Sequence, residues 1–295
     1  PAGQLRRGLW GIGPIAAAAS LISLVACLEL TGPNENNPDR VRATATPGDV
    51  ENLIASTFQT WWPRVYGTSP TIMWSQLAYE FSSPFVCYGA QDNAIEPRSQ
   101  YNNTTVYTRS DISSGTWLTL YGVISQVNDG LQAMDRGVKI GTNGADTKRA
   151  QAFAKFMQGL ATGYLALMYD KAVILDEHAD LDTLTVPTYV EYPVVMAAAI
   201  AMLKESIALS DANTFTLPSV GWVPGLAITN KELSKLAHTY IARFTAYLPR
   251  TIAERAAVNW NTVITESDAG ITADFAPIGI PLVFEDQYKQ RAARL

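Results

Sequence analysis

The N-terminal region contains an uncharged run, residues 8–28 (GLWGIGPIAAAASLISLVACL), directly after Arg6 and Arg7. As a helix with a rise of about 1.5 Å per residue, this run is about 31 Å long, close to the thickness of a membrane's hydrocarbon layer. Positively charged residues before such a run favour a cytoplasmic N-terminus. The run therefore predicts one membrane-crossing or signal helix, with the rest of the chain on the extracytoplasmic side.

The end of this run permits two fates for the helix. The sequence LVAC, which ends at Cys27, matches a lipobox, in which small residues let a signal peptidase cut before a lipid-modified cysteine. Residues 1–26 would then be removed and Cys27 lipidated. In the alternative, residues 1–28 remain as an uncleaved anchor. In either case, the polar, proline-containing segment 29–45 is predicted to be a linker to a domain of residues 46–295.

The composition of the 295 residues excludes several classes of function. With 47% hydrophobic and 17% charged residues, the chain can bury a large core. A net charge of -5 and a pI near 5.1 provide no basic surface for nucleic acid. His178 and His238 have no Cys or His neighbours at zinc-ligand spacing, and Cys87 is expected to be a small buried apolar residue. We expect no metal and no cofactor.

Six amphipathic helices are predicted in residues 46–295, because capping signals recur before segments with apolar residues spaced by about 3.6. The clearest signals are Thr46 followed by Pro47, and Thr251 followed three residues later by Glu254, which is a capping box. The predicted helices are one after Thr46 that carries Val50 to Trp61, then Thr116–Asp135, Asp146–Tyr169, Tyr192–Ser210, Asn230–Leu248, and one from Thr251 that includes Val258 and Val263.

The second of these helices carries one continuous apolar stripe, which consists of Trp117, Tyr121, Ile124, Asn128 and Leu131. We expect this stripe to face the core and not to bind a ligand.

Residues 62–115 and 211–228, rich in Pro, Ser, Asn and aromatic residues, are predicted to be long loops available for a ligand-facing surface. Helices at intervals of roughly 30 to 40 residues favour stacked helix hairpins like tetratricopeptide repeats.

Five segments carry distinctive motifs: the LVAC box at Leu24–Cys27, ATPGDVENLIASTFQTWW at Ala45–Trp62, the Trp117 stripe, AFAKFMQGLATGYLALMYDKA at Ala152–Ala172, and LAHTYIARF at Leu236–Phe244. Together they resemble the SusD/RagB family of surface lipoproteins. The resemblance implies a mainly α fold of stacked, TPR-like helix hairpins, and a role beside an outer-membrane transporter in capturing glycans or other nutrients. The matching motifs pack helices, so they bear on the fold more than on the function.

Members of this family are usually longer, with a C-terminal half that supplies much of the ligand surface, whereas this chain ends at Leu295. A shortened member is expected to be a non-enzymatic docking or scaffold subunit on the periplasmic side of the inner membrane. Its partners would then be membrane lipid and subunits of an integral membrane complex. A concrete candidate is an accessory subunit of a bacterial photosynthetic reaction centre and light-harvesting assembly. The alternative is an outer-membrane lipoprotein that delivers glycan to a TonB-dependent transporter.

Aromatic residues before the Trp117 helix are the candidates for an interface or a ligand site. Exposed rings stack on sugar faces or fill pockets on partner proteins, whereas buried rings anchor the core or a loop, and the sequence leaves both alternatives open. The candidates are Trp62, Trp74, Tyr79, Tyr88, Tyr101 and Tyr107, with Trp61 beside them.

An acidic run after the third predicted helix also has two interpretations. Its carboxylates could hold calcium, but the run lacks the glycine turn of a known calcium loop, which favours a solvated loop. The run consists of Asp170, Asp176, Glu177, Asp180 and Asp182.

Catalytic signatures such as a nucleophile elbow, a phosphate-binding glycine loop or HExxH do not occur, and we therefore predict no enzyme activity.

We predict that residues 8–28 stay in the native protein as a transmembrane helix. The intact mass of the purified protein would then include residues 1–26. N-terminal sequencing that begins at a lipidated Cys27 would contradict this and favour nutrient capture.

Overall fold

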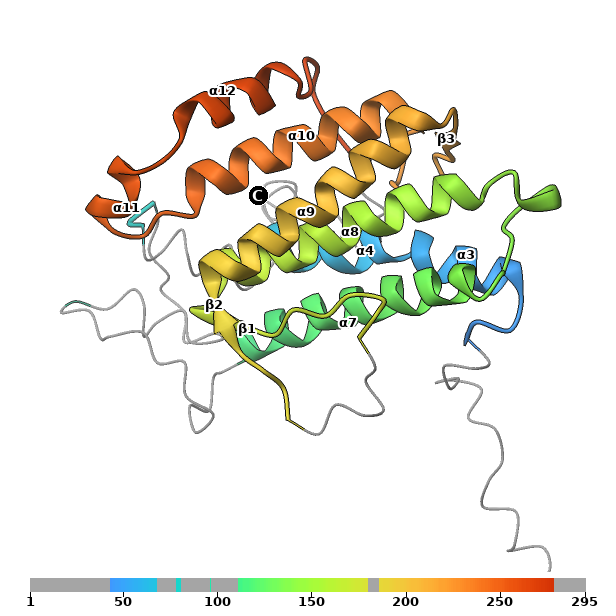
Figure 1. The fold of residues 1–295 in the computed structure, drawn as a ribbon, viewed down its shortest axis with the longest axis horizontal. Helices are drawn as coiled ribbons and strands as arrows, with labels where there is room; N and C mark the ends of the chain where they lie inside the picture. Colours follow the sequence, from blue (N-terminus) through green and yellow to red (C-terminus); the bar gives the residue numbers. More distant parts are fainter. Residues whose placement is uncertain (1–42, 68–77, 81–95, 97–110, 180–185, 279–295) are drawn as a thin grey trace, which may run out of the picture. The chain divides into compact units, whose positions relative to one another are not determined.

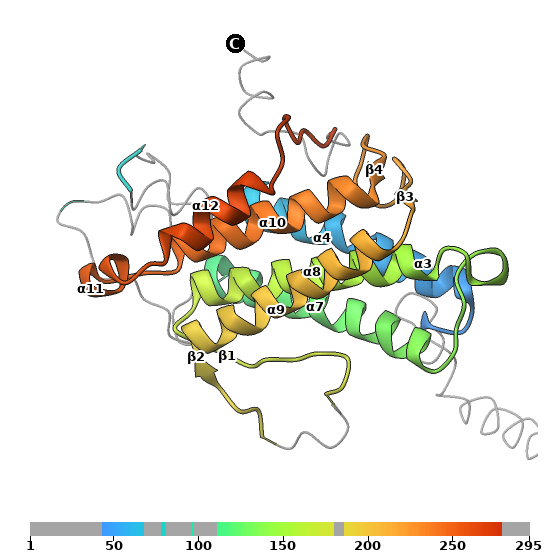
Figure 2. The same cartoon turned by 45° about the horizontal axis from the view of Figure 1, so that its top comes forward.

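The described part of the chain is mainly helical, and its helices follow one another in antiparallel order (Figures 1 and 2). The computed structural model describes residues 43–67, 78–80, 96, 111–179 and 186–278. These residues belong to a unit formed by Ala43–Leu295. The predicted anchor, the possible lipidation site Cys27 and most of the linker lie outside the described residues, as does Cys87.

The first helical segment begins where the sequence predicted. Thr46 caps α3 (Pro47–Ala55), and its side chain and that of Asp49 form a reciprocal capping box. The segment is interrupted at Ser56 and continues as α4 (Thr57–Trp62), followed by a π-helical turn, η1 (Pro63–Gly67). Residues 62–67 are therefore helical and not part of a loop.

Four long helices form the body of the domain. They are α7 (Asp111–Asp135), α8 (Thr147–Met168), α9 (Tyr192–Ala212) and α10 (Asn230–Tyr247). Their existence and approximate limits agree with the prediction, but α7 begins five residues earlier than expected, at Asp111. A short 3-10 turn, η2 (Thr142–Gly144), lies between α7 and α8.

Two small antiparallel ladders hold the ends of the longer connections together. Strand β1 (Lys171–Ala172) pairs with β2 (Val190–Glu191), so the chain returns to α9 close to the end of α8. Strand β3 (Thr216–Leu217) pairs with β4 (Ile228–Thr229) between α9 and α10. The predicted loop 211–228 thus contains the end of α9, strand β3 and the first residue of β4.

The sixth predicted helix is wrong as one continuous element. Thr251 and Glu254 do form a capping box, at the start of α11 (Ile252–Ala256), but that helix ends after five residues. Asn259 then caps a separate helix, α12 (Trp260–Asp268), so Val258 lies between two helices. The Asn259 side chain accepts a hydrogen bond from the Thr262 amide, which starts a new helix.

Helix α8 is the centre of the domain, because every residue from Ala152 to Ala166 is buried. It packs against α7 on one side and against α9 and α10 on the other, and α3 and α4 also contact it. Figures 1 and 2 show α8 between these helices. A helix that is covered on all sides does not need one apolar face and one polar face.

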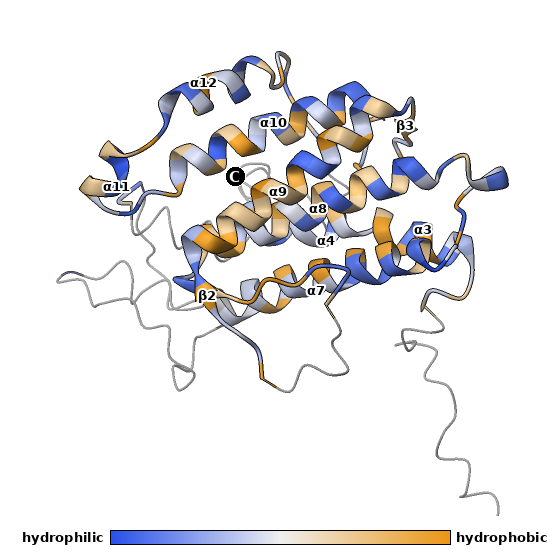
Figure 3. Ribbon diagram, viewed as in Figure 1, coloured by the Kyte–Doolittle hydropathy of each residue, from blue (hydrophilic) through white to orange (hydrophobic). Residues whose placement is uncertain are grey.

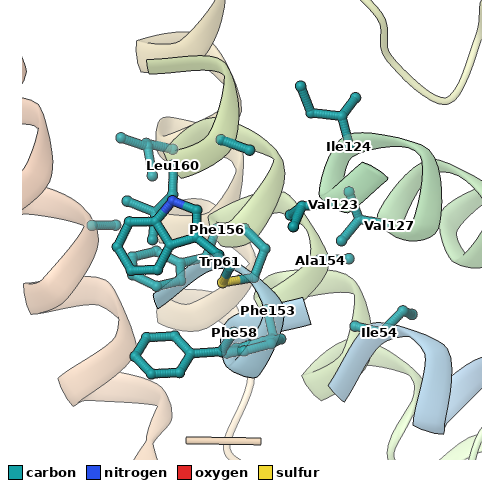
Figure 4. Packing of buried hydrophobic residues seen from close by; sticks show 14 of the residues in the cluster. Ile54, Phe58, Trp61, Val123, Ile124, Val127, Phe153, Ala154, Phe156 and Leu160 are labelled. Atoms are coloured by element: carbon teal, nitrogen blue, oxygen red, sulfur yellow. The ribbon is translucent and has the colours of Figure 1, made fainter. Parts of the chain in front are cut away.

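The core around α8 is largely aromatic on its α4 side. Figure 4 shows Phe58 and Trp61 of α4 beside Phe156 and Leu160 of α8, with Val123 and its neighbours arriving from α7. The Trp61 ring is fully buried and meets the rings of Tyr164 and Tyr240 edge-on. Side chains from four helices therefore form one continuous core.

Among the described residues, α9 is the one helix that is long and apolar enough to cross a membrane. Figure 3 shows the apolar residues along it. Its contacts with α8 and α10 also fit a core helix of the domain. By length and composition alone, this is weak support for a membrane span.

Gly163 on α8 is predicted to be essential for close packing against α10. A methyl group at this position would overlap the ring of Phe244, which is fully buried. Gly163→Ala should therefore lower the free energy of unfolding by about 1–3 kcal/mol, as overpacked cores do.

Gly122 on α7 is the matched control, because an added methyl group there meets no atom within 4 Å. Gly122→Ala should stabilise the domain by up to about 1 kcal/mol through helix propensity. Urea unfolding of both variants measures the difference. Equal stability of the two variants would show that α8 and α10 do not approach as described.

Candidate interaction surfaces

Of the six predicted interface residues, the structure describes two. Trp62 is half-buried and packs on the rings of Phe58, Tyr66 and Phe275, with centroids 5.4, 4.7 and 6.3 Å away. Tyr79 is 69% exposed and has a left-handed backbone conformation. Trp62 thus anchors the edge of the aromatic core, while Tyr79 is at the surface. Trp74, Tyr88, Tyr101 and Tyr107 lie outside the described residues.

Three tyrosine hydroxyls meet next to Trp62. Tyr66 Oη lies 2.6 Å from Tyr164 Oη and 3.4 Å from Tyr240 Oη. Burial raises the pKa of Tyr164 and of Tyr240 above the ordinary range of a phenol. These two buried phenols therefore stay neutral at physiological pH, and they link η1, α8 and α10.

Arg243 of α10 lies at the exposed edge of this tyrosine group. Its Nη1 donates a hydrogen bond to Tyr66 Oη at 3.1 Å. The guanidinium carbon is 5.7 Å from the centre of the Tyr66 ring and 5.5 Å from that of Tyr247, within cation–π range. Tyr247 is 65% exposed. We call Tyr66, Arg243 and Tyr247 the Arg243 surface.

A second aromatic group lies at the start of α7. The Trp117 ring contacts Tyr121 and Tyr169 at 4.8 and 4.9 Å, and it stacks on Tyr189 at 6.3 Å with an interplanar angle of 24°. Tyr189 is 56% exposed, and the neighbouring Leu118 is 70% exposed. This group therefore has one buried side and one side open to solvent.

The predicted α7 stripe packs against the core as expected. Ile124, Asn128 and Leu131 are buried, and Trp117 and Tyr121 are partly buried against the same core. The Tyr121 hydroxyl donates to the Val173 carbonyl at 2.9 Å and accepts from the Val173 amide at 2.7 Å. Burial raises the pKa of Tyr121 to about 12, so this hydroxyl keeps its proton.

Glu177 corrects the prediction of a solvated acidic loop, because it is buried. Its carboxylate lies 2.6 Å from Lys155 Nζ and accepts a hydrogen bond from Gln158 at 3.0 Å. Lys155 also pairs with Glu205 at 2.7 Å. Because α8 is covered on all sides, its polar residues need partners such as these, and Glu177 supplies one from the loop.

The other acidic residues of this run have different surroundings. Asp170 forms an ion pair with Arg250, whose Nη2 also donates to the carbonyls of Ala166 and Tyr169, each at 2.9 Å. Arg250 thus satisfies carbonyls at the end of α8, where a cation is also favoured by the helix dipole. Asp176 is half-buried, and Asp180 and Asp182 lie outside the described residues.

No group of three or more His, Cys, Asp or Glu residues in the described part of the chain could hold a metal ion. His178 contacts Glu177 at 3.5 Å, and His238 Nδ1 lies 2.6 Å from Glu266 Oε2. The second contact joins α10 to α12. The described ionic groups therefore connect elements of the fold to one another.

Helices α11 and α12 have no buried residue. Trp260 and Ile264, one turn apart on α12, are 54% and 56% exposed, and Ile252 of α11 is 87% exposed. The opposite side of α12 packs on α10. We call Ile252, Trp260 and Ile264 the α11–α12 surface.

Comparison of the chain with protein-family models, with curated proteins and with solved structures found no match. The SusD/RagB resemblance thus rests on the quoted motifs alone.

The sequence reasoning did not identify the Arg243 surface or the α11–α12 surface. Tyr240, Arg243 and Tyr247 have the spacing of one helix face, and this spacing was a usable signal for part of the Arg243 surface. The contribution of Tyr66, from an element far away in the chain, had no such signal. The α11–α12 surface was missed because one continuous helix was expected where two helices occur.

Replacement of Glu177 by Gln is predicted to destabilise the domain by about 3 kcal/mol. This is the lower end of the range for breaking a buried ion pair, because Lys155 would still have its ion pair with Glu205. Burial raises the pKa of Glu177, but hydrogen bonds from Lys155 and Gln158 outweigh burial and hold it below its ordinary value. Because its pKa is lowered on folding, the Glu177 carboxylate stabilises the folded state at pH values above its unfolded-state pKa of roughly 4.3. This stabilisation is lost as the pH falls through the pKa of Glu177 in the folded state.

Urea unfolding between pH 2 and pH 7 tests both effects, with the pH limits chosen to bracket roughly 4.3. The variant should lose stability at pH 7 and show a weaker pH dependence on the acid side. Glu191→Gln is the control, since Glu191 pairs with Lys171 at the surface, where both side chains are more than half exposed, and little change is expected. Equal effects of the two substitutions would contradict the burial of Glu177.

Proposed function

We propose that the chain is a non-enzymatic docking subunit, anchored in the membrane by its N-terminal helix and bound through its extracytoplasmic helical domain to a membrane protein complex. The observation that carries the proposal is the α11–α12 surface. It presents large apolar side chains on helices that contribute none of their own residues to the buried core.

The spacing of these side chains favours an interface over chance exposure. Singly exposed apolar residues are common on soluble domains and need no explanation. Trp260 and Ile264, however, lie four residues apart on one helix face, with Ile252 more exposed still on the preceding helix. Tryptophan is also among the residues that contribute most to protein interfaces when it becomes buried there.

A membrane anchor makes such a limited surface sufficient. An anchored chain has already lost much of its translational freedom, so docking costs less than it would for a soluble protein. The antiparallel helices fit the proposed stacked, SusD-like arrangement of hairpins. A photosynthetic reaction centre and light-harvesting assembly remains the concrete candidate for the complex.

The proposal predicts that the full chain, purified in mild detergent, comes with a stoichiometric membrane complex. Trp260→Asp should reduce the recovered partner about tenfold or more, as for an interface residue of high energy. It should leave the melting temperature nearly unchanged, because Trp260 is exposed in the isolated domain.

Val220→Asp is the matched control, since Val220 is 82% exposed outside this surface. It should keep the partner. Recovery of the wild-type chain as a lone monomer would refute the docking proposal. An intact complex with Trp260→Asp would remove the observation that carries it.

The alternative proposal, nutrient capture by a lipoprotein modified at Cys27, is favoured by one observation. Tyr189 exposes a ring that stacks on Trp117, an arrangement suited to the face of a sugar. Calorimetry with oligosaccharides would support this alternative if a lone monomer bound them. Binding that required Tyr189, Trp62 or Trp74 would establish the sugar contact.

A further inference from the structure

The Arg243 surface contains one cation, the guanidinium of Arg243. Among the described residues, no carboxylate forms an ion pair with Arg243. Arg149 and Arg250 differ in this respect, because Arg149 pairs with Glu51 and Arg250 pairs with Asp170. These two arginines hold the fold together through ion pairs, and Arg243 does not.

Within the part of the chain that the structure describes, the surroundings of Arg243 orient the guanidinium without supplying a negative charge. One hydrogen bond to Tyr66 uses one of its five N–H donors, and the rings of Tyr66 and Tyr247 flank it. The buried phenols behind Tyr66 are neutral. A planar guanidinium held in this way is suited to bind a carboxylate through two parallel hydrogen bonds.

We propose that the Arg243 surface binds an acidic side chain of a different protein, with the partner's carboxylate on Arg243 and its neighbouring apolar atoms against Tyr66 and Tyr247. This inference rests on the proposed docking function and specifies a second contact and its chemistry. Arginine and tyrosine are enriched among the residues that dominate interfaces. Charge complementarity commits the site to an acidic partner.

The Arg243 guanidinium is held in place by elements of the fold from different parts of the chain. Tyr66 belongs to η1, Arg243 and Tyr247 belong to α10, and the Tyr66 hydroxyl is tied to Tyr164 of the central helix α8. The guanidinium is therefore positioned before a partner arrives. Such preorganisation lowers the entropic cost of binding.

Photo-crosslinking in native membranes tests the inference. The full chain would carry p-benzoylphenylalanine in place of Tyr247, and mass spectrometry would identify the crosslinked peptide. We expect a segment of another protein that contains Asp or Glu. The same probe at Val220, which is 82% exposed, is the control and should not crosslink to that segment.

Charge reversal then tests the role of Arg243. Arg243→Glu should reduce the crosslink yield about tenfold or more, whereas Arg136→Glu, at an exposed arginine after α7, should not. Replacement of the partner's acidic residue by Arg should restore the yield with Arg243→Glu. If Arg243→Glu lowers the melting temperature, Arg243→Gln, which removes the positive charge without adding a negative one, should give the same loss of yield.

The outcomes separate this inference from the docking proposal. A wild-type complex whose recovery depends on Trp260, combined with an unchanged crosslink yield for Arg243→Glu and Arg243→Gln, would overturn the inference alone. A crosslink only to lipid, to a second copy of this chain or to nothing would also overturn it. A lone wild-type monomer would overturn both proposals.

Discussion

The burial of α8 on every side determines how the rest of the domain is built. Because all residues from Ala152 to Ala166 are buried, α7, α9, α10 and the α3–α4 pair must each provide an apolar face toward this helix. Gly159 and Gly163 allow two of these neighbours to come close, since a methyl group would meet Leu203 of α9 at the first position and Phe244 of α10 at the second. Small residues in the centre thus decide where the outer helices lie.

The same burial explains why most described charged clusters have a structural role. Lys155 and Gln158 point into the domain from α8, and their buried polar groups require partners because water cannot reach them. Glu177, from the connection after β1, meets both of them, and Arg250 satisfies the carbonyls at the end of α8. Arg243 and the α11–α12 side chains are outside this system, which is why the two proposals rest on them.

The sequence predicted most helices well and the surfaces poorly. Capping residues such as Thr46 and Thr251 act within one turn, so their signals could be found without knowledge of the fold. The box of Thr229 and Glu232 at α10 was equally visible but was overlooked. Burial of Glu177 depends on Lys155, which lies more than twenty residues earlier, and a local pattern indicated only a polar loop. The break before α12 was missed because the cap at Asn259 was read as part of a helix.

Hydrogen exchange measured by mass spectrometry tests the central claim most directly, namely that a fully covered α8 supports outer surfaces that are free to dock. In the dissociated chain, the amides of α8 should exchange only upon global unfolding, whereas those of α11 and α12 should exchange much faster. In the detergent-extracted complex, α12 and the end of α10 should become protected, with α8 unchanged. Fast exchange in α8, or identical exchange of α12 and α10 in both samples, would contradict the claim.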